Sequence, residues 1–318
     1  MSTSATSSSR IVLATRESAL AIWQARYIQT RLTETHPGLD VQILGMTTEG
    51  DRKLDTSLAK IGGKGLFVKE LEDALARGAA DIAVHSMKDV PMELVPGHVI
   101  AAIPERADPR DAFVSNRYAA LSDLPAGARV GTSSLRRESQ LRAARPDLVI
   151  EPLRGNVPTR LRKLDEGNYD AILLAAAGLK RLGLADRITA LLPTEVSLPA
   201  AGQGAIGIEC RADRADVRRL LTPLDHEATA LAVRAERAVS RTLAGSCNVP
   251  LAAYAEVSGT TMRLRAFVGA PDGSRAVRDA LEGPAADGEL HGIALANRMR
   301  EAGAADILSA LAASEVRK

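Results

Sequence analysis

An alternation of short apolar runs with amphipathic stretches occurs twice in the first two thirds of the chain, and it constrains the fold more than any other feature. In the first round, Ser18 can cap a helix that runs through about His36, and Gly78 can end a second helix over 65–78. These helices separate predicted strands at 10–15, 41–46 and 81–85. A β-α-β-α-β order implies parallel strands in a sheet that helices cover.

The second round follows the same order. A strand at 129–134 runs into a helix that ends before Pro146, and Asn156 can cap a further helix through Glu166. The other predicted strands of this round are 148–153 and 169–175. We therefore expect two α/β lobes, whose ligands bind beyond the carboxyl ends of the strands.

The segments between these parts predict the domain organisation. Residues 104–113 are rich in proline and charge and are interpreted as a crossing between the lobes, and 198–210 as a second crossing that runs into a strand. After residue 222 the pattern predicts a helix over 227–245, strands near 251–257, 262–268 and 274–281, and helices after 287, which together make a small α+β domain with an antiparallel sheet. The predicted domains are 1–104 with 205–222, 105–204, and 223–318.

Composition narrows the class of protein. The net charge is only +2 and aromatic residues make up 3% of the chain, which counts against a nucleic-acid binder, although basic runs at 136–145 and 154–163 keep that alternative open. The two cysteines, Cys210 and Cys247, form no CxxC motif, so no zinc site is predicted and a reducing compartment fits best. The first nine residues lack the apolar stretch of a secretory signal, and no run approaches the roughly 20 apolar residues that span a membrane. We expect a cytoplasmic protein.

Two glycine-rich motifs invite a nucleotide-binding interpretation that their context does not support. GQGAIG at 202–207 leads into a predicted strand, whereas a dinucleotide site needs a helix after the glycines. GGKG at 62–65 lacks the spacing of a P-loop and is interpreted as a flexible loop that carries Lys64, a candidate lid.

Arginines gather where the predicted cleft should lie. Each of six arginines lies at or just past the end of a predicted strand: Arg16, Arg136, Arg137, Arg154, Arg160 and Arg181. A guanidinium binds a carboxylate through two parallel hydrogen bonds. Any one of them is equally an ordinary surface residue, but together they predict a substrate with many carboxylates.

Two further positions carry reactive groups. Asp89, beside Lys88, follows the strand at 81–85, where an ionised carboxylate could stabilise a positive charge or move a proton, or else cap a helix or pair with Lys88. Cys247 lies in a Gly/Ser/Pro loop, where it could be a nucleophile, an attachment point or an idle thiol. Cys210 lies in an apolar run and is expected to be packed.

Long runs of the sequence resemble the porphobilinogen deaminase family, also called hydroxymethylbilane synthase. The resemblance begins at Arg10 and is carried by HSMKDVP (85–91), GTSSLRR (131–137), LRGNVPTR (153–160), IGGKGLFVKELE (61–72) and LPAAGQGAIGIE (198–209). It implies a monomeric transferase of tetrapyrrole (porphyrin) biosynthesis with two lobes like those of periplasmic binding proteins. It also implies a third domain that carries a dipyrromethane cofactor through a thioether on Cys247. Such an enzyme joins four porphobilinogen molecules head to tail, releases ammonia and yields hydroxymethylbilane.

The resemblance also implies roles for individual residues. Asp89 would be the catalytic carboxylate and Cys247 the cofactor attachment point, while the lid loop would include Lys60, Lys64 and Phe67. The residues that would bind cofactor and substrate carboxylates are Arg16, Ser18, Lys88, Ser134, Arg136, Arg137, Arg154, Arg160, Arg181 and Gln203. Ser246 stands where the family usually has glycine, but serine is small and attachment should survive. No metal, nucleic acid or membrane partner is implied.

One alternative remains besides the nucleic-acid binder. A non-catalytic intracellular binder of an anionic small molecule would use the same two-lobe cleft and the same arginines. The presence of both Asp89 and Cys247 favours the enzyme.

Overall fold

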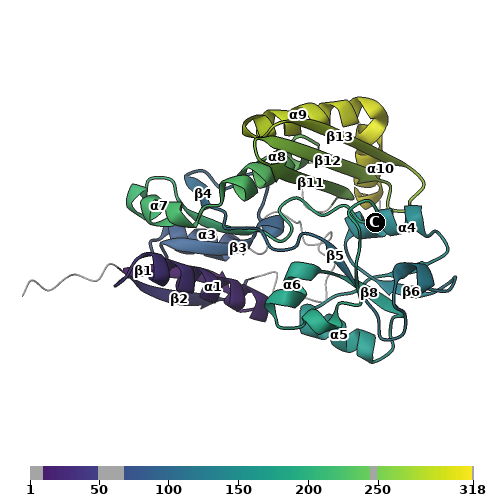
Figure 1. The fold of residues 1–318 in the computed structure, drawn as a ribbon, viewed down its shortest axis with the longest axis horizontal. Helices are drawn as coiled ribbons and strands as arrows, with labels where there is room; N and C mark the ends of the chain where they lie inside the picture. The colour runs from purple at the N-terminus through teal and green to yellow at the C-terminus, as the bar shows by residue number, and fades with distance from the viewer. Residues whose placement is uncertain (1–9, 49–67, 244–248, 317–318) are drawn as a thin grey trace, which may run out of the picture.

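Three sheets, each with its own helices, make up the computed structural model, which describes residues 10–48, 68–243 and 249–316 (Figure 1). Two sheets are mixed and have five strands each, and the third is antiparallel with three strands. This arrangement confirms the predicted fold class of two α/β units and a small α+β unit. The exact domain boundaries stay predictions.

The first sheet has the strand order β2-β1-β3-β10-β4. Its strands are β1 (Arg10–Arg16), β2 (Asp40–Met46), β3 (Ile82–Ser86), β4 (His98–Ala102) and β10 (Ile206–Arg211), and its helices are α1 (Ala19–Thr35), α3 (Lys69–Ala76) and α7 (Ala215–Leu221). β1 runs parallel to β2 and β3, as expected, while β10 is antiparallel to both β3 and β4. The chain therefore returns to the first sheet at β10 after it has formed the second.

Local sequence explains the ends and faces of the helices in this unit. The Ser18 hydroxyl accepts a hydrogen bond from the Ala21 N–H at 3.4 Å and so caps α1, and Gly78 has a φ of 68° just after α3. α1 packs Ile28 and Leu32 into one core cluster, whereas Leu71 of α3 belongs to another. The strand residues alternate between these clusters, so the two helices cover opposite faces of the sheet.

The second sheet has the order β7-β6-β8-β5-β9. Its strands are β5 (Asp111–Val114), β6 (Arg129–Gly131), β7 (Val149–Glu151), β8 (Ala171–Ala175) and β9 (Ala190–Leu191), with α4 (Leu135–Ala144), α5 (Val157–Asp165) and α6 (Ala176–Arg181). The predicted cap holds, because the Asn156 Oδ1 accepts a hydrogen bond from the Thr159 N–H at 3.0 Å. The interpretation of 104–113 as a connection is wrong for its last three residues, which begin β5. Charged residues directly before β5 made the segment resemble a connection, although Phe113 of this strand is completely buried.

The third sheet is formed by β11 (Leu251–Ser258), β12 (Thr261–Gly269) and β13 (Ala276–Pro284), in that order. Three helices accompany it: α8 (Glu227–Leu243), α9 (Gly288–Met299) and α10 (Ala305–Val316). Val239 of α8, Leu264 of β12 and Leu295 of α9 meet in its core. Within the described ranges, no helix is long and apolar enough to cross a membrane.

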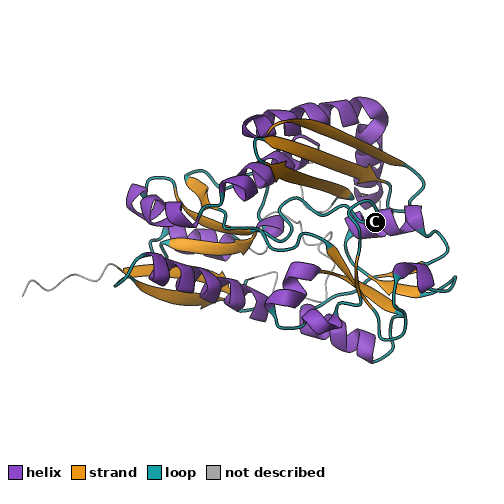
Figure 2. Ribbon diagram, viewed as in Figure 1, coloured by secondary structure: helices purple, strands orange, loops and turns teal. Residues whose placement is uncertain are grey.

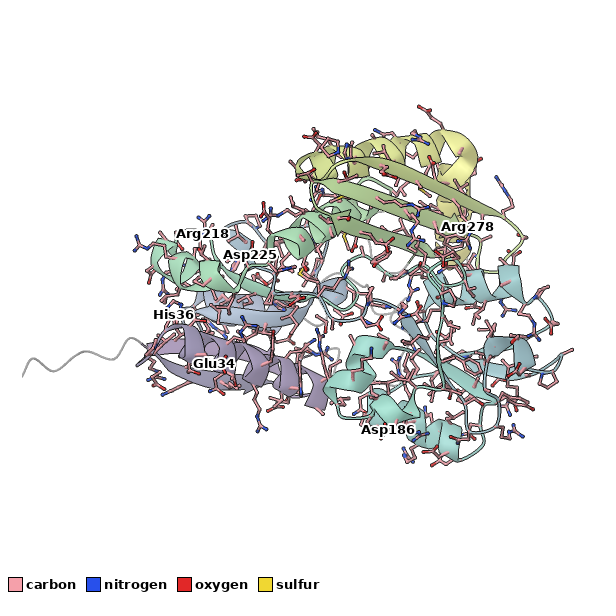
Figure 3. The ribbon with its side chains drawn as sticks, viewed as in Figure 1. Glu34, His36, Asp186, Arg218, Asp225 and Arg278 are labelled. Carbon is pink, nitrogen blue, oxygen red and sulfur yellow. The ribbon has the colours of Figure 1, made fainter. Side chains whose placement is uncertain are left out.

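Buried polar groups join the two connections between the α/β units to the third unit. Arg106, in the first connection, pairs with Glu236 of α8 through two bonds of 2.6 and 2.8 Å, and Glu236 also accepts the Gly202 N–H of the second connection at 2.7 Å. A Cβ on Gly204 would lie 2.5 Å from the Ala107 oxygen, so the connections approach each other where only glycine fits. Figure 2 shows these connections as loops between the sheets. By contrast, the charged side chains of Glu34, Asp186 and Arg218 lie exposed on the outer surface (Figure 3).

Candidate active site

A short 3₁₀ turn, Met87–Asp89, follows β3 and carries the predicted catalytic carboxylate. Met87 is 1% exposed, and its N–H donates to the Ala205 oxygen at 3.0 Å. A Cβ on Gly207 would lie 2.2 Å from the Met87 sulfur, and one on Gly202 would lie 2.8 Å from its Cβ. The GQGAIG run therefore supplies close packing for this turn, and Asp89 is exposed beside the buried methionine.

A pocket beside Asp89 contains two of the predicted binding residues. It is lined by Arg16 and Ser18 from the end of β1 and the start of α1, by Gln24 of α1, and by Ser86 and Asp89. Because β1 and β3 are parallel neighbours, their carboxyl ends meet at one edge of the sheet. The topology thus brings Arg16 and Asp89 together, although 70 or so residues separate them in the chain.

Four basic side chains, Lys88, Arg137, Arg154 and Arg160, form what we call the cation cluster, close to Asp89. Burial lowers the pKa of Lys88 to about 8; Asp89 opposes this shift, while Arg137 adds to it. Burial likewise lowers the pKa of Arg160 to about 10, with Arg137 and Arg154 contributing and Asp89 opposing. Crowded cations disfavour one another's charged forms, and an anion bound among them would relieve that repulsion.

Asp111, at the start of β5, was missed by the sequence reasoning and organises two of the predicted arginines. Arg136 binds its carboxylate through Nη1 at 2.8 Å and Nη2 at 3.1 Å, and Arg137 through Nη2 at 2.7 Å and Nε at 3.0 Å. Gln203 Nε2 at 2.9 Å and the Ser197 hydroxyl at 2.7 Å also donate to it. Although burial opposes the shift, the two arginines hold the pKa of Asp111 far below its usual range. The sequence offered one indication of this role: Asp111 is an acidic residue at the start of a strand, and the chain contains two adjacent arginines that could pair with it.

Arg136 also contacts the second connection between the α/β units. Its guanidinium also donates to the Leu198 oxygen at 2.7 Å and to the Gln203 Oε1 at 3.4 Å, and the side chain is 5% exposed. Arg136 and Gln203 are thus bound to Asp111 and to the second connection in this structure. Their predicted role toward ligand carboxylates stays a prediction.

The remaining predicted residues are distributed as follows. Ser134 lies at the N-terminal end of α4, which carries Arg136 and Arg137 in its first turn. Arg181, at the end of α6, donates to the Gly204 oxygen at 2.7 Å and stacks over the Trp23 ring, 5.6 Å from its centroid, so it lies at the contact with α1. Burial lowers the pKa of Arg181 to about 10. The predicted roles of Cys247, Lys60, Lys64 and Phe67 concern residues outside those that the structure describes.

The fold and site together define a class: an α/β protein of two mixed sheets whose strand ends carry a carboxylate within a cluster of cations, as a binder of polyanionic small molecules requires. The family model described as "Porphobilinogen deaminase, dipyromethane cofactor binding domain" matches residues 11–219, and "Porphobilinogen deaminase, C-terminal domain" matches 230–301. The chain belongs to the porphobilinogen deaminase family, and it contains the cofactor-binding domain of that family.

Similar proteins cover almost the whole chain. The porphobilinogen deaminases of Ralstonia nicotianae and Thiobacillus denitrificans are each 63% identical to it, over 96% and 95% of this chain and 92% and 99% of their own lengths. That of Nitrosomonas europaea is 62% identical over 95% of this chain and 98% of its own. Among solved structures, the methionine-binding protein MetQ has 15% identity and a TM-score of 0.43 over 67% of this chain and 89% of that chain.

Proposed function

We propose that the chain carries out the porphobilinogen deaminase reaction by using the cation cluster to bind carboxylates and Asp89 to stabilise positive charge. In this proposal, four porphobilinogen molecules are joined head to tail on a primer attached to Cys247, ammonia is released at each step, and hydroxymethylbilane is the product. The observation that carries the proposal is the position of an exposed carboxylate, Asp89, close to the cation cluster, whose members follow β3 and β7 or lie in α4 and α5.

Binding of substrate carboxylates explains why several basic side chains lie close together in the cation cluster. Each porphobilinogen unit carries an acetate and a propionate, so a growing chain is a dense polyanion. Arg154 and Arg160, at the end of β7 and in α5, can hold such groups bidentately, and Lys88 acts as a point charge. Asp111 supports this function indirectly, because it neutralises only part of the charge of Arg136 and Arg137.

Asp89 supplies the chemistry that the cations cannot. Loss of ammonia leaves porphobilinogen as an electron-poor methylene-pyrrole cation, and an ionised carboxylate facing the pyrrole N–H would stabilise it. The same carboxylate can take the proton that leaves the ring carbon when the new carbon–carbon bond has formed.

The residues present fit a dipyrromethane cofactor, whose carboxylates match the guanidinium donors of the cation cluster. When bound, this group supplies the acceptor carbon for the first condensation. A covalently held acceptor makes each condensation effectively intramolecular, which removes the entropic penalty of gathering both partners. Cys247 is the proposed attachment point. Cys210 is a poor alternative, because its side chain is fully buried and burial raises the pKa of its thiol to about 11.

Intact mass with peptide mapping of both cysteines tests the attachment. We expect an added mass of two linked porphobilinogen-derived units on Cys247, its loss in Cys247→Ser, and its retention in the matched control Cys210→Ala. A Cys247 that stays unmodified after incubation with porphobilinogen would contradict the proposal. Ammonia release in the same incubation separates the enzyme from a non-catalytic binder of anions.

We further propose that the enzyme acts as a monomer in the cytoplasm, as the family resemblance implies. The use of one cysteine for a thioether and the burial of the other fit a reducing compartment. A single species at the mass of one chain in light scattering is the expected result, and a stable dimer would contradict it.

A further inference from the structure

The last two residues of β3, just before the turn that carries Asp89, are held by side-chain contacts. Ser86 exchanges hydrogen bonds with the Gln24 amide of α1, at 2.9 and 3.2 Å. His85 contacts Glu209 of β10, with 2.8 Å between its Nε2 and the Glu209 Oε2. Successive strand residues point to opposite faces of a sheet, so one contact lies on each face.

The His85–Glu209 contact belongs to a buried group of titratable side chains. In the register of β3 and β10, His85 lies opposite Gly207 and Glu209 lies opposite Ala83, which makes the two side chains diagonal neighbours on one face. Ala83 packs with Leu71 and Leu75, so this is the face that α3 covers.

Two more titratable residues border the pair. Glu72 of α3 is 8% exposed, and its carboxylate accepts a hydrogen bond from the Val95 N–H. His98 of β4 lies two residues along the register from Ile100, the partner of Glu209 on that side. A helix and three strands thus each contribute one titratable group.

Fold stability does not explain this group. The Glu209 side chain is completely buried, and in the part of the chain that the structure describes its Oε1 has no hydrogen-bond partner. Replacing a buried ion pair by apolar residues of similar volume is often neutral or stabilising, and the neighbouring positions on this face are alanine and leucine. Among the described residues, no group of His, Cys, Asp and Glu side chains could hold a metal ion. A role in holding a particular geometry is therefore the better explanation.

We infer that His85 and Glu209 are positioning residues for the reaction: their contact fixes the end of β3, and with it the place of Asp89, which lies four residues after His85 in the chain. The inference rests on the proposed function of Asp89. Because Met87 already packs on Gly202 and Gly207, a shift of β3 relative to β10 would move the whole turn and would misplace the carboxylate against the substrate. Misplacement by about 1 Å can lower a rate by roughly a hundredfold.

The charges around the pair affect the pH dependence of kcat, which a purely structural contact would leave unchanged. Burial raises the pKa of Glu72 and Glu209 adds to that shift, while His85 and His98 oppose it. Without the Glu209 carboxylate, the limb of the kcat profile that reports on Glu72 should therefore move to lower pH.

Glu209→Gln tests the inference, because it keeps the shape and removes the charge. We expect full cofactor loading by intact mass, a kcat lowered roughly tenfold to a hundredfold, a KM within about twofold of the wild type, and a kcat–pH profile moved to lower pH. Glu256→Gln is the matched control: it makes the same substitution at an exposed carboxylate of β11, which pairs with Arg265, and should leave that profile unchanged.

A loaded Glu209→Gln variant with wild-type kcat and pH profile would overturn the inference, as would one that is less stable but equally active. If this variant does not fold, Glu72→Gln gives the second test, since it removes a neighbouring carboxyl and keeps a hydrogen-bond acceptor for Val95; a wild-type pH profile would then count against the inference. Wild-type protein that releases no ammonia from porphobilinogen would instead refute the proposed function.

Discussion

Asp111→Asn should destabilise the second α/β unit strongly, because it removes the charge that two buried arginines share. Arg136 and Arg137 are 4% and 5% exposed and Asp111 is completely buried. Asparagine has nearly the same shape, but it keeps only one of the two oxygens that accept hydrogen bonds from Gln203 and Ser197. The substitution therefore removes the negative charge together with one of these acceptors.

The size of the effect follows from the burial of the partners. Breaking a buried ion pair by removing one partner typically lowers the free energy of unfolding by about 3–5 kcal/mol, since an uncompensated charge stays buried. Here two guanidiniums lose their counter-charge, so we expect the upper part of that range. Asp108→Asn is the matched control, from the connection just before β5: its partners Arg110 and Lys180 have side chains that are 43% and 44% exposed, and exposed pairs contribute about 0–1 kcal/mol.

Urea unfolding followed by circular dichroism, at several pH values, measures both variants against the wild type. The folded-state pKa of Asp111 lies below the unfolded value, so its contribution is fully present above about pH 4 and is lost as the pH falls further. The gap between wild type and Asp111→Asn should therefore be constant from pH 7 to about pH 5 and narrow in stronger acid. An Asp111→Asn variant no less stable than Asp108→Asn would refute the reasoning.

Three further predictions follow from the same geometry. Asp89→Asn, at an exposed position, should keep the stability and the cofactor mass of the wild type but lower kcat by about 10²–10⁴-fold, as measured by hydroxymethylbilane formation; near-normal turnover would remove Asp89 from the chemistry. Lys88, with its pKa lowered to about 8, should regain a proton when a carboxylate binds, so porphobilinogen binding to the inactive Asp89→Asn variant should take up protons above about pH 8. Calorimetry in two buffers measures this uptake, and its persistence in the double variant with Lys88→Gln would assign it elsewhere. Glu236→Gln, which leaves Arg106 without its buried partner, should lower the free energy of unfolding by about 3–5 kcal/mol in urea, and a value near zero would show that the link between the connections and α8 is dispensable.

Much of the fold could be predicted from local signals. The caps at Ser18 and Asn156 define the starts of α1 and α5 through hydrogen bonds to residues three positions away. Strands such as β1 and β8 are continuous apolar runs, as expected for strands buried on both faces. Such signals fail for β5, where charged residues directly precede a short strand, and the sequence reasoning accordingly missed Asp111.

The sequence predicted which residues belong to the candidate site, but it did not predict how they pair with one another. Residue type and position at a strand end were enough to single out Asp89, Arg154 and Arg160, because strand ends of an α/β sheet form one edge. Neither property distinguishes Arg136, which is bound to Asp111, from Arg160, which lies beside Asp89. That distinction depends on which carboxylate lies nearby, and Asp111 is 25 residues from Arg136 in the chain.

The sequence by itself determined the helix caps, the alternation of strands and helices and, through its long characteristic runs, the family. Each of these depends on residues near one another in the chain, where propensity and hydrogen bonding act locally. Only the tertiary structure decided that β10 returns to the first sheet, that Glu209 lies beside His85, and which cations are neutralised. Those outcomes depend on long-range packing, because the charge and protonation of a buried group are set by whatever the fold places within a few ångströms of it.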